Sequence, residues 1–338
     1  MNVMRRNRRC HNVQMPVPPK RKFYYPGCLC IMLLLCTLVT PYKLFAQLTY
    51  ENLIVDYDSS WVCKNLKLIP VKFKDKGTPQ DKFLTTGIMT FEEALHENKI
   101  SVKEMSLPGG PDVGMLTIKN HSKKSIIVQS GEMIAGGKQD RAFAISTIIP
   151  PGEGDNFIPV FCVEKGRWDH RLRTFRYAGP ANVSLRKKID IEKKQNKVWK
   201  EIDRQLSEQG VTNASGAYID LYRDTASVDS SCFRMLKKKM TESDSLYAGF
   251  IAVTGNRIID CELFGSSDLC IASFDAMLKS YLRSINANDG VPNVSDTEIK
   301  NFLDDFLQSE PQQQKYLSRH GSIYTYQNHV IHLIAYND

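Results

Sequence analysis

Short apolar stretches separated by turn residues dominate the chain from residue 47 to about residue 165. Strands are predicted near residues 66–73, 114–119, 125–129, 142–149 and 157–163. Clusters of Gly, Pro and Asn between such stretches are typical of an antiparallel sheet or a sandwich. A short helix is predicted over Thr90–Asn98, because Thr90 can cap it while Glu93, three residues later, completes a capping box.

The second half of the chain mixes helical and strand patterns. Apolar residues recur at helical spacing within residues 187–209, at Val198, Ile202 and Leu206. Further helices are predicted over residues 217–221 and 232–240, and from Ser267 and Ser295 onward. Two hairpins are predicted, one turning at Gly255-Asn256 and one closing the chain over residues 323–336. The predicted fold class is therefore α+β, with a β-rich first half (antiparallel sheet or sandwich) followed by mixed helices and β-hairpins.

The amino-terminal segment has the three parts of an export signal. A basic stretch precedes an apolar run over Cys28–Thr40, and Ala46 is a plausible last residue of the leader. The run has 13 residues, too few for a helix across a hydrocarbon layer about 30 Å thick. We expect residues 1–46 to be a signal peptide and residues 47–338 to form a single mixed α+β domain, periplasmic or secreted, with no stable membrane span. An uncleaved membrane anchor is the alternative.

Charge and cysteine content narrow the possible partners. Residues 1–46 hold eight of the 45 basic residues and no acidic one, which leaves 37 basic against 37 acidic residues. A neutral chain gives no reason to expect nucleic acid as a partner. An odd number of cysteines without a C-x-x-C pair signals no disulfide framework. The cysteines after residue 46 are Cys63, Cys162, Cys232, Cys261 and Cys270. Of these, Cys162 and Cys261 are expected to be buried, inert thiols.

Residues 131–141 combine glycines with charged and amide side chains between two predicted strands. Glycine lets backbone N–H groups approach a ligand, and Lys138 and Arg141 could hold a phosphate or carboxylate there. Gln139 could orient a polar group, and Glu132 is the candidate acid or base. The sequence is not a P-loop, because Gln139 follows Lys138. The alternative is a glycine-rich hairpin with a solvated, charged tip.

Residues 162–171 form a second candidate segment. Arg167 beside Trp168 offers a cation and a flat stacking surface, which suits a nucleotide-like ligand. Glu164 is a second candidate acid or base. In the alternative interpretation, Trp168 anchors a loop to the core. The pair His329 and His332 would point to opposite faces of a strand, so we expect no metal site there and no cofactor.

The two segments together resemble the ARG and Rhodanese-Phosphatase-superfamily-associated Protein domain family. The resemblance is carried by Gly131-Glu132, Gly137–Arg141, Pro150–Gly152, Ile158–Val160 and Cys162–Trp168. It continues through Val198-Trp199, Gly216–Asp220, Gly249–Ala252, Glu262–Phe264 and Ser280-Tyr281, and covers residues 51–286.

What the resemblance implies about activity is limited. The family's name records an association with ADP-ribosylglycohydrolase-like and rhodanese- or phosphatase-like proteins, and it implies no particular reaction. Asp140 stands where the family often has Asn, which weakens any role that needs a neutral amide at that position.

Two functions therefore follow from the sequence. We expect an exported, non-catalytic binding or interaction module, with an envelope protein as the partner and the charged residues forming an ion-pair network. The alternative is binding or hydrolysis of a small anionic ligand, phosphate-bearing and nucleotide-like (ADP-ribose type). In that case Glu132 and Glu164 are the candidate catalytic residues, and the ligand-binding residues are Lys138, Gln139, Arg141, Arg167 and Trp168. The sequence leaves open whether the chain is an enzyme.

Overall fold

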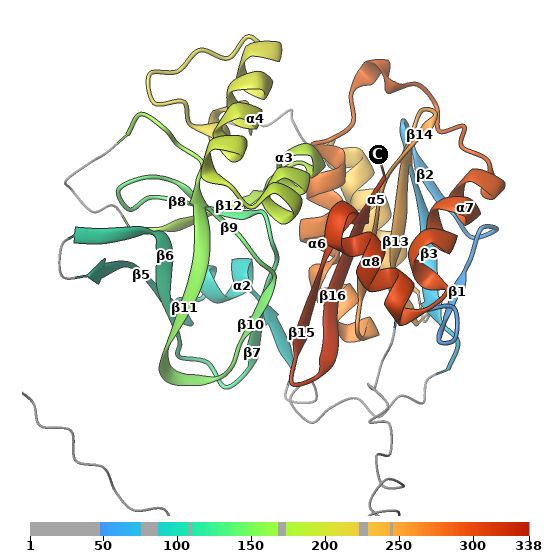
Figure 1. The fold of residues 1–338 in the computed structure, drawn as a ribbon, viewed down its shortest axis with the longest axis horizontal. Coiled ribbons are helices and arrows are strands. Elements are labelled where there is room, and N and C mark those ends of the chain that lie inside the picture. The colour runs from blue at the N-terminus through green and yellow to red at the C-terminus, as the bar shows by residue number, and fades with distance from the viewer. Residues whose placement is uncertain are drawn as a thin grey trace, which may run out of the picture. The chain divides into compact units, whose positions relative to one another are not determined.

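The fold is taken from a computed structural model, which describes residues 48–75, 87–107, 110–167, 174–222, 229–243 and 246–337 (Figure 1). The expected signal peptide and Trp168 lie outside the described residues. None of the described helices is long and apolar enough to cross a membrane.

Strands from both ends of the described chain share one seven-stranded sheet. Its order is β1-β3-β13-β14-β16-β15, with β2 beside β3, and every pairing is antiparallel. The strands are β1 (Leu53–Val55), β2 (Trp61–Cys63), β3 (Leu66–Phe73), β13 (Tyr247–Thr254), β14 (Arg257–Phe264), β15 (Gly321–Tyr326) and β16 (His329–Tyr336). The early run β3 is therefore a central strand of a sheet that is completed about 180 residues later, as the register of Ile69 with Ile251 shows.

Helices cover both faces of this sheet (Figure 1). On one face, α5 (Ser230–Thr241) and α6 (Ser267–Leu282) share a core with alternate residues of β13 and β14. On the other, α7 (Asp296–Leu307) and α8 (Glu310–His320) do the same. Because neither face meets solvent, β13 is buried at every residue, which explains its unbroken apolar sequence.

Two smaller sheets form the β-rich part of the fold. The first has the order β12-β8-β9-β11-β6-β5 and the second β10-β7-β4, in which β4 and β7 are parallel. Their strands are β4 (Ile88–Thr90), β5 (Ile100–Leu107), β6 (Gly110–Asn120), β7 (Ser125–Val128), β8 (Glu132–Ala135), β9 (Arg141–Phe143), β10 (Thr147–Ile149), β11 (Gly152–Cys162) and β12 (Arg176–Pro180). The α+β prediction is confirmed, with a β-rich first half that is mostly antiparallel.

Side chains of β8 and β9 point alternately into two cores. Ile134 and Phe143 pack with α2 (Phe91–His96). Met133 and Ala142 pack with a helical layer on the other side. That layer consists of α3 (Val183–Lys187), the π-helix η1 (Lys188–Glu192), α4 (Gln195–Glu208) and the 3-10 helix η2 (Tyr218–Tyr222). A further 3-10 turn, η4, covers Ala287–Asp289. The two strands that flank the turn of the first candidate segment, β8 and β9, are therefore packed on both faces.

The predicted helix starts and the predicted hairpin turn are confirmed where hydrogen bonds between residues close in sequence determine the structure. Capping boxes are present at Thr90 and at Ser295, and the hairpin turns at Gly255-Asn256. The single strand predicted over residues 142–149 is wrong, because β9 and β10 belong to different sheets. The long helix predicted within residues 187–209 is interrupted at Lys193, which has a φ of 52°.

The cysteine prediction needs a correction. Cys63 on β2 and Cys232 on α5 form a disulfide, with Cα atoms 5.7 Å apart and a sequence separation of 169. Neither an odd cysteine count nor the missing C-x-x-C spacing tests for a bridge between residues that only the fold brings together. Cys162 and Cys261 are buried and lie outside any disulfide, as expected.

Candidate functional site

The turn after β8 depends on two glycines with positive φ, Gly136 at 134° and Gly137 at 52°. A Cβ on Gly136 would lie 2.6 Å from the carbonyl oxygen of Thr174, and one on Gly137 would lie 2.4 Å from the ring of Phe175. Only glycine fits at this approach of two backbone segments. This turn presents two carbonyl oxygens to Arg167.

Arg167 is held entirely by acceptors of the protein itself. Its Nη1 and Nη2 donate to the carbonyl oxygens of Gly137 at 3.0 Å and Gly136 at 3.2 Å. Its Nη2 also pairs with Asp140 at 2.9 Å, and its Nε donates to Glu164 at 2.7 Å. The guanidinium thus closes a network between the two candidate segments.

The carboxylates of this network are nearly inaccessible. The side chains of Asp140 and Glu164 are each 5% exposed, against 15% for Arg167. Burial, together with the charge of Glu164, raises the pKa of Asp140. Burial works to lower the pKa of Arg167, but the hydrogen bonds and charges of Glu164 and Asp140 together outweigh that effect, so the net shift is upward. Arg167 therefore serves first as the counter-ion of two buried carboxylates.

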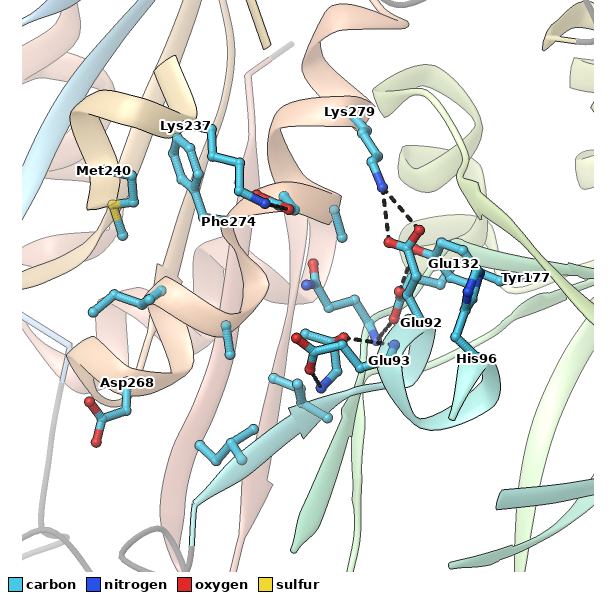
Figure 2. A pocket seen from close by; sticks show the side chains of 18 of the residues that line it. Glu92, Glu93, His96, Glu132, Tyr177, Lys237, Met240, Asp268, Phe274 and Lys279 are labelled. Atoms are coloured by element: carbon cyan, nitrogen blue, oxygen red, sulfur yellow. Dashed lines mark hydrogen bonds and ion pairs between the residues drawn. The ribbon is translucent and has the colours of Figure 1, made fainter. Parts of the chain in front are cut away.

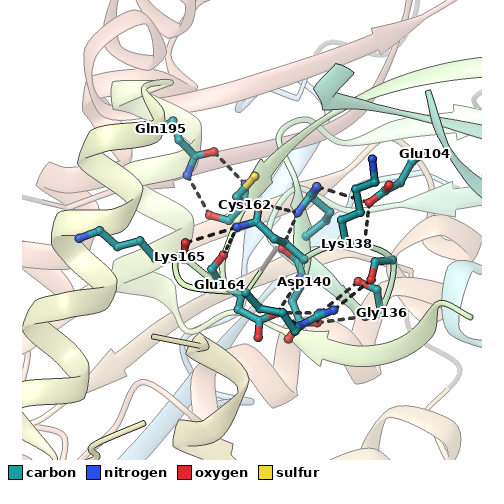
Figure 3. Close-up of polar contacts among 12 residues, drawn as sticks. Glu104, Gly136, Lys138, Asp140, Cys162, Glu164, Lys165 and Gln195 are labelled. Carbon is teal, nitrogen blue, oxygen red and sulfur yellow. Dashed lines mark hydrogen bonds and ion pairs between the residues drawn. The ribbon is translucent and has the colours of Figure 1, made fainter. Parts of the chain in front are cut away.

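The other predicted ligand-binding residues are joined to the same structure (Figure 3). Arg141 is 1% exposed and lies 3.6 Å from Glu104 of β5. The backbone N–H of Lys138 donates to the same Glu104 carboxylate at 2.8 Å. The side-chain amide of Gln139 donates to the carbonyl of Glu164 at 2.8 Å. Every interaction named here is with a group of the chain itself.

Glu132 lies apart from this network, at the opposite end of β8. Its carboxylate accepts hydrogen bonds from the backbone N–H of Gln129 at 2.7 Å and from the hydroxyl of Tyr177 at 2.8 Å. The residue is 3% exposed, and burial raises its pKa to about 7. The structure therefore brings together residues 136–141 and 162–167, which include the candidate acid or base Glu164, but it places the other candidate, Glu132, elsewhere.

A cavity of about 790 Å³ opens beside Glu132 (Figure 2). It is lined by residues of α2 and β4 on one side and of α5 and α6 on the other. Two ion pairs cross its walls, Lys279 with Glu92 at 2.9 Å and Lys237 with Asp275. A buried carboxyl group whose pKa is shifted toward neutrality, in the wall of a cavity, is a typical feature of functional sites.

A second cavity, of about 490 Å³, borders the Arg167 network. It is lined by Asp140, Glu164 and Arg167, together with Arg176 of β12, which is exposed. The anion site predicted from the sequence would lie here, and Arg176 is a cation outside the predicted site residues.

A buried polar cluster joins the seven-stranded sheet to the smaller sheets. His332 on β16 bonds through Nδ1 to Ser146 at 2.8 Å and through Nε2 to Glu262 at 2.8 Å. Arg186 of α3 pairs with both oxygens of Glu262, at 2.7 and 3.0 Å. The order resembles a serine–histidine–acid arrangement, yet Ser146 is 3% exposed and already accepts the N–H of Ser130 at 3.0 Å.

This cluster is a structural junction that one sequence signal could have indicated. Asp260 and Glu262 interrupt the otherwise apolar run of β14, and both are fully buried. Acidic residues on a strand with buried neighbours need buried partners, which points to a polar junction. Among the residues that the structure describes, no group of His, Cys, Asp and Glu side chains is arranged to hold a metal ion.

The architecture and the motif define the class of protein, an α+β domain whose glycine-rich hairpin is closed by Arg167. The chain belongs to the ARG and Rhodanese-Phosphatase-superfamily-associated Protein domain family, whose family model matches residues 54–336. The match confirms the resemblance of the motif and extends it to the closing hairpin. No curated protein and no solved structure matches the chain.

Proposed function

We propose that the chain is an exported, non-catalytic binding module whose charged motif is structural and whose ligand occupies the larger cavity. One observation carries this proposal. Arg167, the central cation of the motif, donates its hydrogen bonds to two carboxylates and two carbonyl oxygens of the chain. A cation engaged in this way is a poor receptor for an additional anion, because the anion would have to displace buried carboxylates.

The larger cavity combines open space with polar groups of several elements. Its volume of about 790 Å³ is within the range of small-molecule sites. Glu132 reaches it from the β-rich part of the fold, and Ala272 reaches it from α6. A ligand there would touch segments that are far apart in sequence, as is common for binding sites between layers.

Export is supported by two independent features. The leader pattern of residues 1–46 is one, and the disulfide between Cys63 and Cys232 is the other. Disulfides persist mainly in oxidising compartments outside the cytoplasm. A periplasmic or secreted location accords with both, and an envelope protein is then the natural macromolecular partner.

A second candidate function is favoured by Arg176. This exposed cation and Arg167 line the 490 Å³ cavity, where a small phosphate-bearing, nucleotide-like ligand of ADP-ribose type would find positive charge. Of the two candidate catalytic residues, Glu164 lines this cavity and Glu132 lines the other, so hydrolysis here would use Glu164.

A thermal-shift screen of the exported protein against nucleotides, ADP-ribose, sugars, phosphates and small amines tests the two cavities separately. Ligand binding to the folded state raises the melting temperature by mass action. We expect a shift that Ala272→Trp abolishes by filling the larger cavity, while Arg176→Ala and the exposed control Lys239→Trp on α5 retain it. A shift with ADP-ribose that only Arg176→Ala abolishes would instead support the second candidate. No shift with any compound would point to a protein partner.

A further inference from the structure

The larger cavity is strongly acidic. Six carboxylates face it against two lysines, a formal balance of four negative charges when all are ionised. The carboxylates are those of Glu92, Glu93, Glu97, Glu132, Asp268 and Asp275. Both lysines already have partners in the wall, since Lys279 pairs with Glu92 and Lys237 with Asp275. The charges that remain for a ligand are therefore negative.

Glu132 is the least accessible of these carboxylates, and it has no counter-ion. Glu132 is only 3% exposed. Within the described part of the chain, no cationic side chain lies at ion-pair distance from its carboxylate. Each of its oxygens accepts one hydrogen bond, from Gln129 or Tyr177, and retains a second lone pair. A carboxylate in this position is ready to accept a donor from the cavity.

Gln129 adds a second acceptor to the wall of the cavity. Its residue is 4% exposed and lines the same cavity. Its side-chain nitrogen donates to the carbonyl of Ser273 at 3.3 Å, while its side-chain oxygen receives no hydrogen bond from any described residue. Because Gln129 lines the cavity, this oxygen can accept a hydrogen bond from a ligand there. Both residues therefore offer an acceptor position to a donor group in the cavity.

The cavity also offers apolar surface, from residues that lie far from these acceptors in the sequence. Ile271 of α6 is 51% exposed although it borders the cavity, and Phe233 of α5 and Ile88 of β4 are partly exposed there. A ligand that combines a charged head with an apolar body would cover both kinds of surface.

On the basis of the proposed function, we propose that the cavity binds a small organic cation, a primary amine with an apolar body. The ammonium group lies against Glu132 and Gln129, where its three N–H donors meet the open acceptor positions. The apolar body packs on Ile271 and its neighbours on α5 and β4. A phosphate or carboxylate ligand is disfavoured at this place, because it would meet unpaired like charges in a partly dehydrated wall.

The charged groups around Glu132 add a pH dependence. Glu92 of α2 raises its pKa and Arg186 of α3 lowers it through space, while Tyr177 of β12 donates to it and Lys279 of α6 is held by Glu92. Burial remains the largest effect and brings the pKa to about 7. An ammonium ion binds the ionised form, so affinity should rise with pH through neutrality, and binding at pH 7 should release about half a proton.

Calorimetric titration with three matched probes tests the ligand class. The probes are 2-phenylethylamine, 2-phenylethanol and phenylacetate, which differ only in the charged or neutral head. At pH 7.5 we expect the amine to bind at least about tenfold more tightly than the alcohol, and phenylacetate not to bind. Titrations of the unmodified protein at pH 7 in two buffers of different ionisation enthalpy should report proton release, and this measurement needs no variant.

Variants then locate the amine. Glu132→Gln should reduce amine affinity at least about tenfold, remove the proton release and leave the alcohol unaffected, whereas the exposed control Glu208→Gln on α4 should change nothing. Equal binding of amine and alcohol, or amine binding that Glu132→Gln leaves unchanged, would overturn the proposal. If the amine fails but another compound shows binding that Ala272→Trp abolishes, the cavity function stands and the ligand class is wrong. If no compound responds to Ala272→Trp, the cavity function itself fails.

Discussion

Replacing Arg167 by alanine separates a structural motif from a binding site. The substitution removes the only side chain among the described residues that pairs with both Asp140 and Glu164. Their carboxylates stay in place, each 5% exposed, and continue to accept the backbone N–H groups of Gly136 and Asp140. Two buried negative charges would then face each other without a cation.

The expected cost follows from that burial. Removing one partner of a buried ion pair typically destabilises a protein by about 3–5 kcal/mol, because the remaining charge is uncompensated. Arg167 is 15% exposed, so water can reach part of the vacated volume and we take the lower end, about 3 kcal/mol. The neighbouring pair of Lys165 and Asp203 is about half exposed on both sides, and Lys165→Ala should cost less than about 1 kcal/mol.

Urea unfolding at neutral pH measures both variants on the same scale. The slope with denaturant should be unchanged, since the fold and the surface exposed on unfolding remain the same. A third protein, Arg167→Met combined with Asp140→Asn and Glu164→Gln, keeps the backbone hydrogen bonds but removes all three charges. It should recover more than half of the lost free energy of unfolding, because a neutral network has no unpaired charge.

The reasoning fails if Arg167→Ala costs no more than the Lys165→Ala control. Such a result would mean that Asp140 and Glu164 do not depend on the guanidinium, so that Arg167 would be available to a ligand. The phosphate-binding alternative would then become the better account of the motif, and the 490 Å³ cavity the better place to look.

Three further predictions concern stability. Replacing Cys63 and Cys232 together by alanine should lower the free energy of unfolding by about 5 kcal/mol, because the bridge closes a loop of 169 residues; a loss under about 1 kcal/mol would show that the thiols are not joined. The raised pKa of Glu132 means that the folded state holds this proton more tightly than the unfolded state does. The free energy of unfolding should therefore fall by about 3 kcal/mol as pH rises from 4.5 to 7. Urea titrations at pH 5 and 8 should show a smaller difference for Glu132→Gln than for the unmodified protein, and an equal difference would contradict the assignment. Gly249→Ala should cost about 3 kcal/mol or more, since the added Cβ would lie 1.9 Å from a carbonyl oxygen of β14, while the control Gly154→Ala meets nothing within 4 Å; equal thermal stability of the two variants would refute that account.

Much of the secondary structure could be predicted because its causes are local. A capping box needs Thr90 and Glu93 only, and the turn between β13 and β14 needs Gly255-Asn256. The helix α8 escaped prediction for a local reason as well. Its sequence is largely polar and buries only Gln313 and Leu317, so its apolar stripe is too narrow to recognise.

Pairing between distant segments could not be predicted in the same way. The apolar run of β3 reads as a strand, but nothing within it specifies β13 as its partner. The disulfide and the split of residues 142–149 into two sheets depend on the same long-range contacts. These features are decided by which faces the helices cover, and that is a property of the whole fold.

For the candidate site, composition predicted the residues that meet but not the state in which they meet. Residues 136–141 do contact residues 162–167, as their shared glycines and charges suggested. A guanidinium in a sequence has the same chemistry whether it is free or paired. Whether it is free depends on the burial of its carboxylate partners, which the motif alone does not show. The partner of Arg141, for example, is Glu104 on β5, more than 30 residues earlier in the chain. Charge in a motif is therefore evidence of an interaction, not of a ligand.

The position of β8 connects the two halves of this interpretation. Its carboxyl end leads into Gly136, which the Arg167 network fixes, and its first residue is Glu132, which lines the larger cavity. This four-residue strand is paired on both sides, with β9 and β12, so both of its ends belong to one hydrogen-bonded ladder. If the larger cavity binds a ligand as proposed, a chemically closed network would still serve binding, because it holds one end of the strand that carries Glu132.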